Sequence, residues 1–161
     1  MKVEVIQADY HDVEHQRLIP ELLDRYARDP MGGGAPLKDE VRERLVGQLA
    51  ARPFAFTLLA FVDGEAAGLA NCFEGFSTFA CRPLVNIHDL SVSEKHRGLG
   101  VSQQLLQKVE DVARSRGCCK ITLEVLGNNI VAQAAYRKFG FTGLVPESGA
   151  AGYLFWEKKL S

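Results

Sequence analysis

The chain has 161 residues, of which 47% are hydrophobic and 24% charged, and its formal net charge is −1. This length predicts a single domain spanning residues 1–161, and the composition excludes a disordered or fibrous protein. Because positive and negative residues are interspersed, we expect no nucleic-acid partner. No apolar run approaches the roughly 20 residues that span a bilayer, and the amino terminus lacks a signal-peptide core. We therefore predict a cytoplasmic protein without a membrane partner.

The four cysteines lack the spacing of a metal site or a redox pair. Cys118 and Cys119 are adjacent and would point to opposite faces of a strand, so a bridge between them is geometrically unfavourable. We expect reduced, packing cysteines and no bound metal.

Apolar periodicity predicts regular elements in the amino-terminal half of the chain. They are a strand at 2–8, a helix at 12–27, a second helix around 41–49, a strand at 54–62 and, after the turn at 63–64, an antiparallel strand at 65–73. Residues 29–36 contain two prolines and the triple glycine 32–34, so a mobile connection without regular structure is expected. A phosphate-binding role for this loop is disfavoured because no strand precedes it.

The carboxyl-terminal half continues the alternation of strands and helices. We expect a loop or broken strand end at 75–83, a strand at 84–92, a helix that includes 105–113 and ends at Gly117, a strand at 121–126, a helix around 132–139, and short strands at 141–145 and 153–158. A helix crossing between the strands at 84–92 and 121–126 makes those two parallel, whereas most other pairs should be antiparallel. The predicted fold class is α/β, a mixed, mostly antiparallel twisted sheet with helices on both faces.

Small residues meet at the junction of a strand and a long helix in the segment Arg97-Gly98-Leu99-Gly100-Val101-Ser102. The first turn of a helix has unpaired N–H groups and a partial positive charge, so it can bind a pyrophosphate that glycines allow to approach. Two glycines alone are equally compatible with a simple turn. The first strand is not followed by Gly-x-Gly-x-x-Gly, and no P-loop motif occurs, so neither NAD nor ATP is indicated.

This segment resembles the pyrophosphate loop of the GNAT superfamily of acetyltransferases, Arg/Gln-x-x-Gly-x-Gly/Ala, with Ser102 in place of the last small residue. A second similarity is an asparagine after a strand and a tyrosine seven residues later, here Asn129 and Tyr136. The resemblance implies a GNAT-like acyl-CoA N-acyltransferase fold, an acetyltransferase activity, and acetyl-CoA as co-substrate without a metal. It also implies that coenzyme A contacts Leu90, Val92, Arg97, Gly98, Leu99, Gly100, Val101, Ser102 and Asn129.

Acetyl transfer to an amine needs a base, because an amine with a pKa near 10.4 is almost fully protonated at neutral pH. The candidates are His88, Asp89 and Glu124, with His88 preferred because an imidazole titrates near neutral pH and Asp89 as the next choice. By resemblance, Tyr136 is the acid that protonates the leaving thiolate. Its helical spacing is also compatible with a core tyrosine.

Two further segments, 76–79 and 86–90, resemble diamine and thialysine acetyltransferases, although that subgroup has a glutamate where His88 stands. We expect direct attack by a primary amine of a small molecule within a ternary complex. Alternatives are a protein lysine or N-terminus as acceptor, or a non-catalytic acyl-CoA sensor. Exposed terminal strands would favour a homodimer.

Overall fold

A computed structural model describes residues 1–144 and 152–160. These residues form seven strands, four α-helices and two short 3₁₀ turns in the predicted order. The elements are β1 (Val3–Gln7), α1 (Val13–Arg28), η1 (Pro30–Gly32), α2 (Asp39–Ala50), β2 (Ala55–Val62), β3 (Glu65–Ser77), β4 (Arg82–Val92), η2 (Glu94–His96), α3 (Val101–Ser115), β5 (Lys120–Leu126), α4 (Ile130–Phe139), β6 (Thr142–Gly143) and β7 (Tyr153–Lys159).

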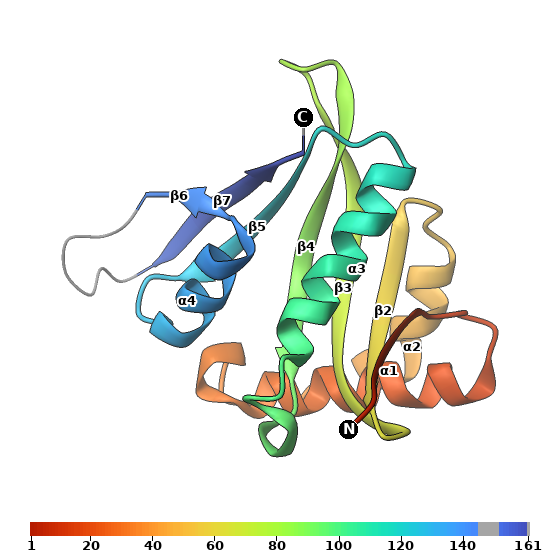
Figure 1. Ribbon diagram of the computed structural model, residues 1–161. Coiled ribbons are helices and arrows are strands. Elements are labelled where there is room, and N and C mark those ends of the chain that lie inside the picture. The colour runs from red at the N-terminus through yellow and green to blue at the C-terminus, as the bar shows by residue number, and fades with distance from the viewer. Residues whose placement is uncertain (145–151, 161) are drawn as a thin grey trace.

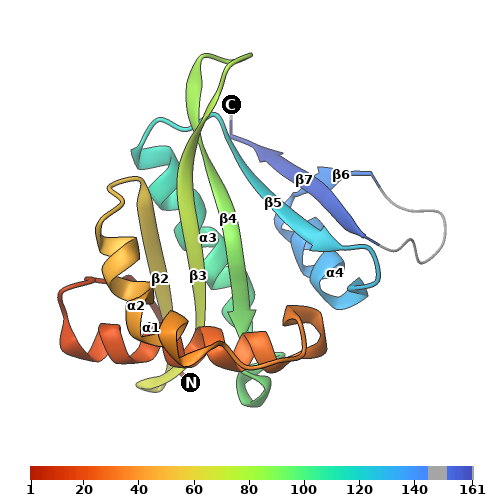
Figure 2. The ribbon, with the colours of Figure 1, turned by 180° about the vertical axis from the view of Figure 1, so that it is seen from behind.

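The strands form one sheet in the order β1-β2-β3-β4-β5-β7-β6. β4 and β5 are parallel, as the crossover through α3 requires, and the other neighbouring pairs are antiparallel. Figure 1 shows α3 and α4 on one face of the sheet, and Figure 2 shows α1 and α2 on the other. The predicted fold class is therefore confirmed. β1 and β6 lie at the two edges of the sheet, and the expected homodimer stays a prediction.

Each face of the sheet has its own apolar core. On the first face, the α3 residues Leu105 and Val109 are fully buried within the larger cluster. On the second, Ile19 of α1 packs with Leu59 and Leu69 of the sheet, and all three are fully buried. Burial of one such side chain contributes about 1.5–3 kcal/mol. The docking of α1 thus has a strong apolar component.

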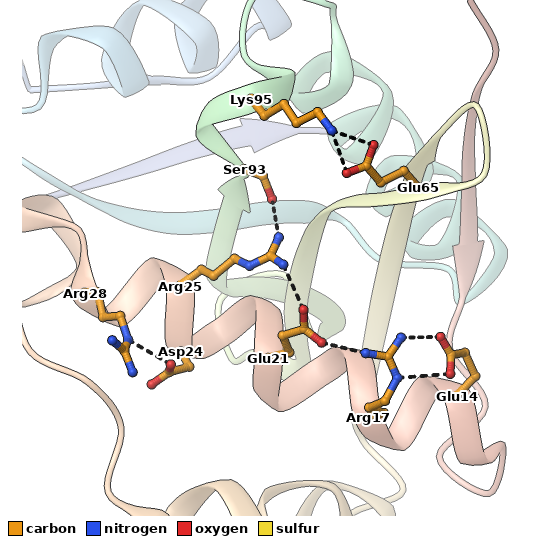
Figure 3. A network of polar contacts seen from close by, with 9 residues as sticks. All are labelled: Glu14, Arg17, Glu21, Asp24, Arg25, Arg28, Glu65, Ser93 and Lys95. Atoms are coloured by element: carbon orange, nitrogen blue, oxygen red, sulfur yellow. Dashed lines mark hydrogen bonds and ion pairs between the residues drawn. The ribbon is translucent and has the colours of Figure 1, made fainter.

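Charged side chains run along the outer surface of α1 (Figure 3). Arg17 pairs with both Glu14 and Glu21, and Arg25 donates to Glu21 at 2.8 Å and to Ser93 Oγ at 3.5 Å. Exposed ion pairs contribute only about 0–1 kcal/mol each. They therefore add little to the apolar packing that holds α1 against the sheet.

The loop or broken strand end expected at 75–83 is instead mostly regular strand. β3 continues to Ser77 and β4 begins at Arg82, so only a short turn separates them. The carbonyl of Pro83 accepts from Cys119 N–H at 2.9 Å, which shows that the Pro83 backbone points away from β3. The missing N–H of proline therefore costs the β3–β4 ladder nothing, and pairing across the hairpin overrides the local turn signals.

The connection after α1 also differs from the expectation, because it contains the 3₁₀ turn η1. Asp29 caps this turn by accepting from Met31 N–H at 2.9 Å, and its carbonyl accepts from Gly32 N–H at 2.8 Å. A Cβ atom on Gly32 would lie 1.9 Å from the carbonyl oxygen of Tyr26. Glycine is required here because the turn packs directly on the backbone of α1.

Three further features concern the end of the chain, the helices and the cysteines. The strand expected at 141–145 is found only as β6, and residue 145 lies outside the described residues. In the described part of the chain, the helices are too short or too polar to cross a membrane. All four cysteines are free thiols.

The close contact at Gly32 predicts opposite effects for two Gly→Ala substitutions. Gly32→Ala should lower the free energy of unfolding by about 1–3 kcal/mol, because the new methyl group meets backbone. Gly47→Ala, in the exposed middle of α2 with open space around it, should raise that free energy by up to about 1 kcal/mol. Urea denaturation of both variants measures the difference, and equal responses would contradict the packing of η1 on α1.

Candidate functional site

β4 carries a bulge at His88. In the pairing with β3, Asn71 lies opposite Asp89 and Cys72 lies opposite Ile87, which leaves His88 as the extra residue. Neighbouring residues of a regular strand point to opposite faces, and an inserted residue changes this alternation. As a result, His88 and Asp89 line the same cavity on the face covered by α1 and α2. The bulge brings together the two side chains that the sequence offered as alternatives.

This cavity, here called the helix cavity, has a volume of about 340 Å³. It lies between the amino-terminal helices and the sheet. Its lining consists of Leu23, Tyr26, Ala27, Gly32, Leu37, Leu45, Leu49, Asn71, Phe73, His88 and Asp89.

A second hollow, here called the strand groove, lies where β4 and β5 separate. Their pairing is limited to 85–87 with 121–123, and beyond it the two strands diverge (Figure 2). The groove has a volume of about 360 Å³. Its lining consists of Tyr26, Met31, Gly32, Gly33, Asn86, Ile87, His88, Asp89, Leu90, Glu124, Val125, Leu126, Asn129, Ala132, Tyr136 and Tyr153. Tyr26, Gly32, His88 and Asp89 line both hollows, so the two meet at these residues.

The edge of β4 that faces β5 has unpaired backbone groups after the separation. Ser93 N–H donates to Ala67 of β3 at 2.7 Å. Because backbone groups of successive strand residues point to opposite edges, those of Val92 and Leu90 point towards β5. The carbonyl of Val92 accepts from Arg97 Nε at 3.2 Å, whereas Leu90 lines the strand groove. Of the two expected backbone contacts, Leu90 is thus the one on the groove.

The segment 97–102 follows η2 at the carboxyl end of β4, outside the lining of the groove. Gly98 and Gly100 have φ values of 79° and 80°, which glycine adopts readily. Gly100 is the N-cap of α3 and supplies no side-chain hydrogen bond, so the N–H groups of Val101 and Ser102 lack an acceptor within the helix. This is the arrangement expected of an anion site, with Leu99 exposed beside it.

Arg97 is held in place by the connection after α1. Its Nη2 lies 3.2 Å from Asp29 Oδ2. The N–H of Met31 and the Arg97 guanidinium hold the pKa of Asp29 below its ordinary value. Arg97 thus links the anion loop to the turn that lies over the groove.

Asp89 is positioned by a chain of buried polar groups that the sequence analysis missed. Asn71 Nδ2 donates to Asp89 at 3.1 Å, and Thr57 Oγ1 donates to Asn71 Oδ1 at 2.7 Å. Since Thr57 uses its proton in this way, Tyr10 is the donor to Thr57, at 2.8 Å. Asn71 and Thr57 are buried. A polar amide within the apolar run of β3 was the signal that could have identified Asn71.

Tyr136 lies in the wall of the strand groove and is 8% exposed. Its ring makes an edge contact with Phe141 at 5.9 Å. Burial raises the pKa of Tyr136, and the nearby Tyr26 raises it further. The phenol therefore keeps its proton throughout the neutral range.

Tyr26, on α1, was not among the predicted site residues. It lines both hollows. Burial raises the pKa of Tyr26, and the charge of Asp89 raises it further. The phenol is thus in the electrostatic field of Asp89 at the centre of the site.

The remaining predicted residues lie farther from the junction of the two hollows. Glu124 is exposed on β5 and lines the strand groove but not the helix cavity. Asn129 caps α4 by accepting from Ala132 N–H at 3.2 Å, and it also lines the groove. Within the described residues, no cluster of three or more His, Cys, Asp or Glu side chains could hold a metal ion.

Comparisons with known proteins identify the family of this chain. Residues 14–141 match the model of the acetyltransferase (GNAT) family. Streptothricin acetyltransferase of Streptomyces lavendulae is 38% identical over 79 residues, which are 49% of this chain and 40% of that protein. Thialysine N-epsilon-acetyltransferase of Sus scrofa is 29% identical over 113 residues, 64% of this chain and 65% of that protein. The chain thus matches less than two thirds of the length of either relative.

The structure of YncA from Salmonella typhimurium, solved with its cofactor acetyl-CoA, has the same fold. The TM-score is 0.76 at 18% identity, over 99% of this chain and 94% of that one. The family match covers most of the present chain, from α1 to the second residue after α4. The chain therefore belongs to the GNAT family of acetyltransferases.

Proposed function

We propose that this protein transfers an acetyl group from acetyl-CoA to the primary amine of a small molecule by direct attack in a ternary complex. The observation that carries the proposal is the position of His88 and Asp89 at the junction of the helix cavity and the strand groove. An acceptor in the cavity and a thioester in the groove would meet at these two side chains. Family membership supports the reaction class.

The chain offers suitable groups for each part of acetyl-CoA. The unpaired N–H groups at the start of α3, together with Arg97, suit the pyrophosphate. The backbone carbonyl of Leu90, on the open edge of β4, suits an N–H group of the pantetheine arm. Arg97 would have to exchange Asp29 for phosphate, or bind both, when the co-substrate enters. Asn129 lines the same groove from the far wall.

His88 and Asp89 can divide the work at the acceptor nitrogen. Asp89, fixed by Asn71, attracts the ammonium form of the acceptor. His88, whose ring packs edge-on against Phe73 at 5.5 Å, accepts one proton from it. The neutral nitrogen then forms a bond to the thioester carbonyl carbon, and its second proton passes to solvent water as the amide forms.

The opposite side of the reaction needs a donor for the oxyanion and a proton for the thiolate. The N–H of Leu90 on the open edge of β4 is our candidate for the oxyanion. When the carbon–sulfur bond breaks, Tyr136 donates its phenolic proton to the sulfur and regains one from solvent. The raised pKa of Tyr136 keeps this proton available.

Release of free thiol from acetyl-CoA tests the proposed function. We expect turnover with at least one primary amine from a panel of small amines, amino acids and short peptides. Turnover with peptides alone would instead establish a protein acceptor. Thermal stabilisation by acetyl-CoA without thiol release from any amine would indicate the sensor alternative.

Replacement of His88 tests its role as base. A protonated imidazole cannot accept a proton, so kcat/KM of the native protein should fall on the acid side of its pH profile. His88→Ala should lower kcat/KM by about a hundredfold or more and remove that acid limb. Glu124→Gln is the matched control and should preserve the limb. If the limb survives in His88→Ala, Asp89 becomes the base.

Replacement of Tyr136 by phenylalanine removes the proposed acid while keeping the aromatic packing. We expect kcat to fall by about a hundredfold or more, with little change in the affinity for acetyl-CoA. The raised pKa of Tyr136 means that the phenol keeps its proton beyond pH 10, where an ordinary tyrosine ionises. Ionisation of Tyr136 should therefore cause no decline in the native kcat near pH 10. Tyr153→Phe, at an exposed position in the same groove, is the control. An unchanged kcat in Tyr136→Phe would refute the assignment.

A further inference from the structure

We infer that the helix cavity selects an amine with one positive charge and an apolar body, such as an arylalkylamine or alkylamine, over diamines and amino acids. This inference rests on the proposed acetyl transfer and identifies the acceptor class of the same site. It follows from where the polar and the apolar side chains lie within the cavity.

The polar groups of the cavity gather at its junction with the strand groove. Asp89 and His88 belong to both hollows, and Asn71 is hydrogen-bonded to Asp89. The oxygen of the Asn71 side chain is already occupied by Thr57. One ammonium group can therefore be matched by a carboxylate here, directly beside the reacting position.

The rest of the lining consists mainly of leucine and aromatic side chains. Leu23 comes from α1, Leu37 precedes α2, and Leu45 and Leu49 project from α2 itself. Among the described residues that line the cavity, Asp89 is the single carboxylate, and none is a lysine or arginine. Away from the junction, the cavity thus offers no counter-charge to a ligand.

Two acidic residues of α1, Asp24 and Glu21, are already engaged by other groups. Asp24 accepts from Arg28 Nε and from Leu37 N–H, each at 2.9 Å. Glu21 is shared between Arg17 and Arg25 on the outer surface of the helix (Figure 3). Neither carboxylate lines the cavity, so neither is placed to receive a second ammonium group.

Burial of a charge without a partner is strongly unfavourable. The second ammonium of a diamine or the carboxylate of an amino acid would meet leucines instead of a counter-charge. An aromatic ring or a short alkyl chain would bury apolar surface at the same place. The cavity volume of about 340 Å³ lies at the small end of the range for ligand pockets.

Steady-state kinetics with 2-phenylethylamine, hexylamine, putrescine and lysine tests the inference directly. We expect kcat/KM for the two apolar amines to exceed that for putrescine and for lysine by about tenfold or more. A preference for putrescine or lysine would overturn the inference and leave the proposed acetyl transfer intact. Acetylation of peptides alone would overturn it as well.

A negative charge placed inside the cavity should change which amine the protein prefers as acceptor. Leu45 is only half-buried, so Leu45→Asp supplies a second carboxylate at a tolerant position. The matched control is Leu45→Asn, which has nearly the same shape and no charge. We expect the ratio of kcat/KM for putrescine to that for 2-phenylethylamine to be about tenfold higher in Leu45→Asp than in Leu45→Asn. Equal ratios in two folded variants would contradict the placement of the ligand body beside Leu45.

A binding measurement separates failure of this inference from failure of the proposed function. Calorimetry with coenzyme A present gives the affinity of each amine without requiring turnover. Binding of 2-phenylethylamine but not putrescine, without thiol release, would support the cavity preference and refute the enzymatic reaction. Thiol release with equal affinity and equal kcat/KM for all four amines would refute the preference and support the reaction.

Discussion

Neighbouring side chains in a regular β-strand point to opposite faces, and β4 overcomes this constraint with one extra residue at His88. The bulge turns His88 and Asp89 towards the same cavity. It lies directly after the last paired residue of the β4–β5 ladder, Ile87. The same short stretch therefore supplies two polar side chains on one face and unpaired backbone groups along one edge, and both features meet where the two hollows join.

The position of α1 is the second determinant of the site. Its apolar stripe fixes the helix against β2 and β3, and this packing carries Tyr26 to the junction of the hollows. The turn that follows packs on the helix backbone at Gly32 and presents Asp29 to Arg97. One helix and its turn thus contact both the cavity that would hold an acceptor and the loop that would hold a phosphate.

Local signals were reliable where a single segment determines the structure. The strand–helix junction at 97–102 and the parallel crossover between β4 and β5 both follow from short-range patterns or chain connectivity. Local signals failed where strand pairing or tertiary packing overrides the conformational propensity of the segment. The segment 75–83 is held mostly in a hairpin despite its glycine and proline, and residues 29–32 form a capped turn against α1.

The sequence alone determined the fold class, the order of the elements and the position of the glycine-containing loop at 97–102, and it offered the short set of titratable residues that we propose for the site. It left His88 and Asp89 as alternatives, and it did not identify Tyr26 or Asn71 as site residues. Only the tertiary structure decided these points, because a bulge is defined by the partner strand and a shared cavity by helices distant in sequence. Non-local hydrogen bonds and packing, which no periodicity encodes, place the four residues around one junction.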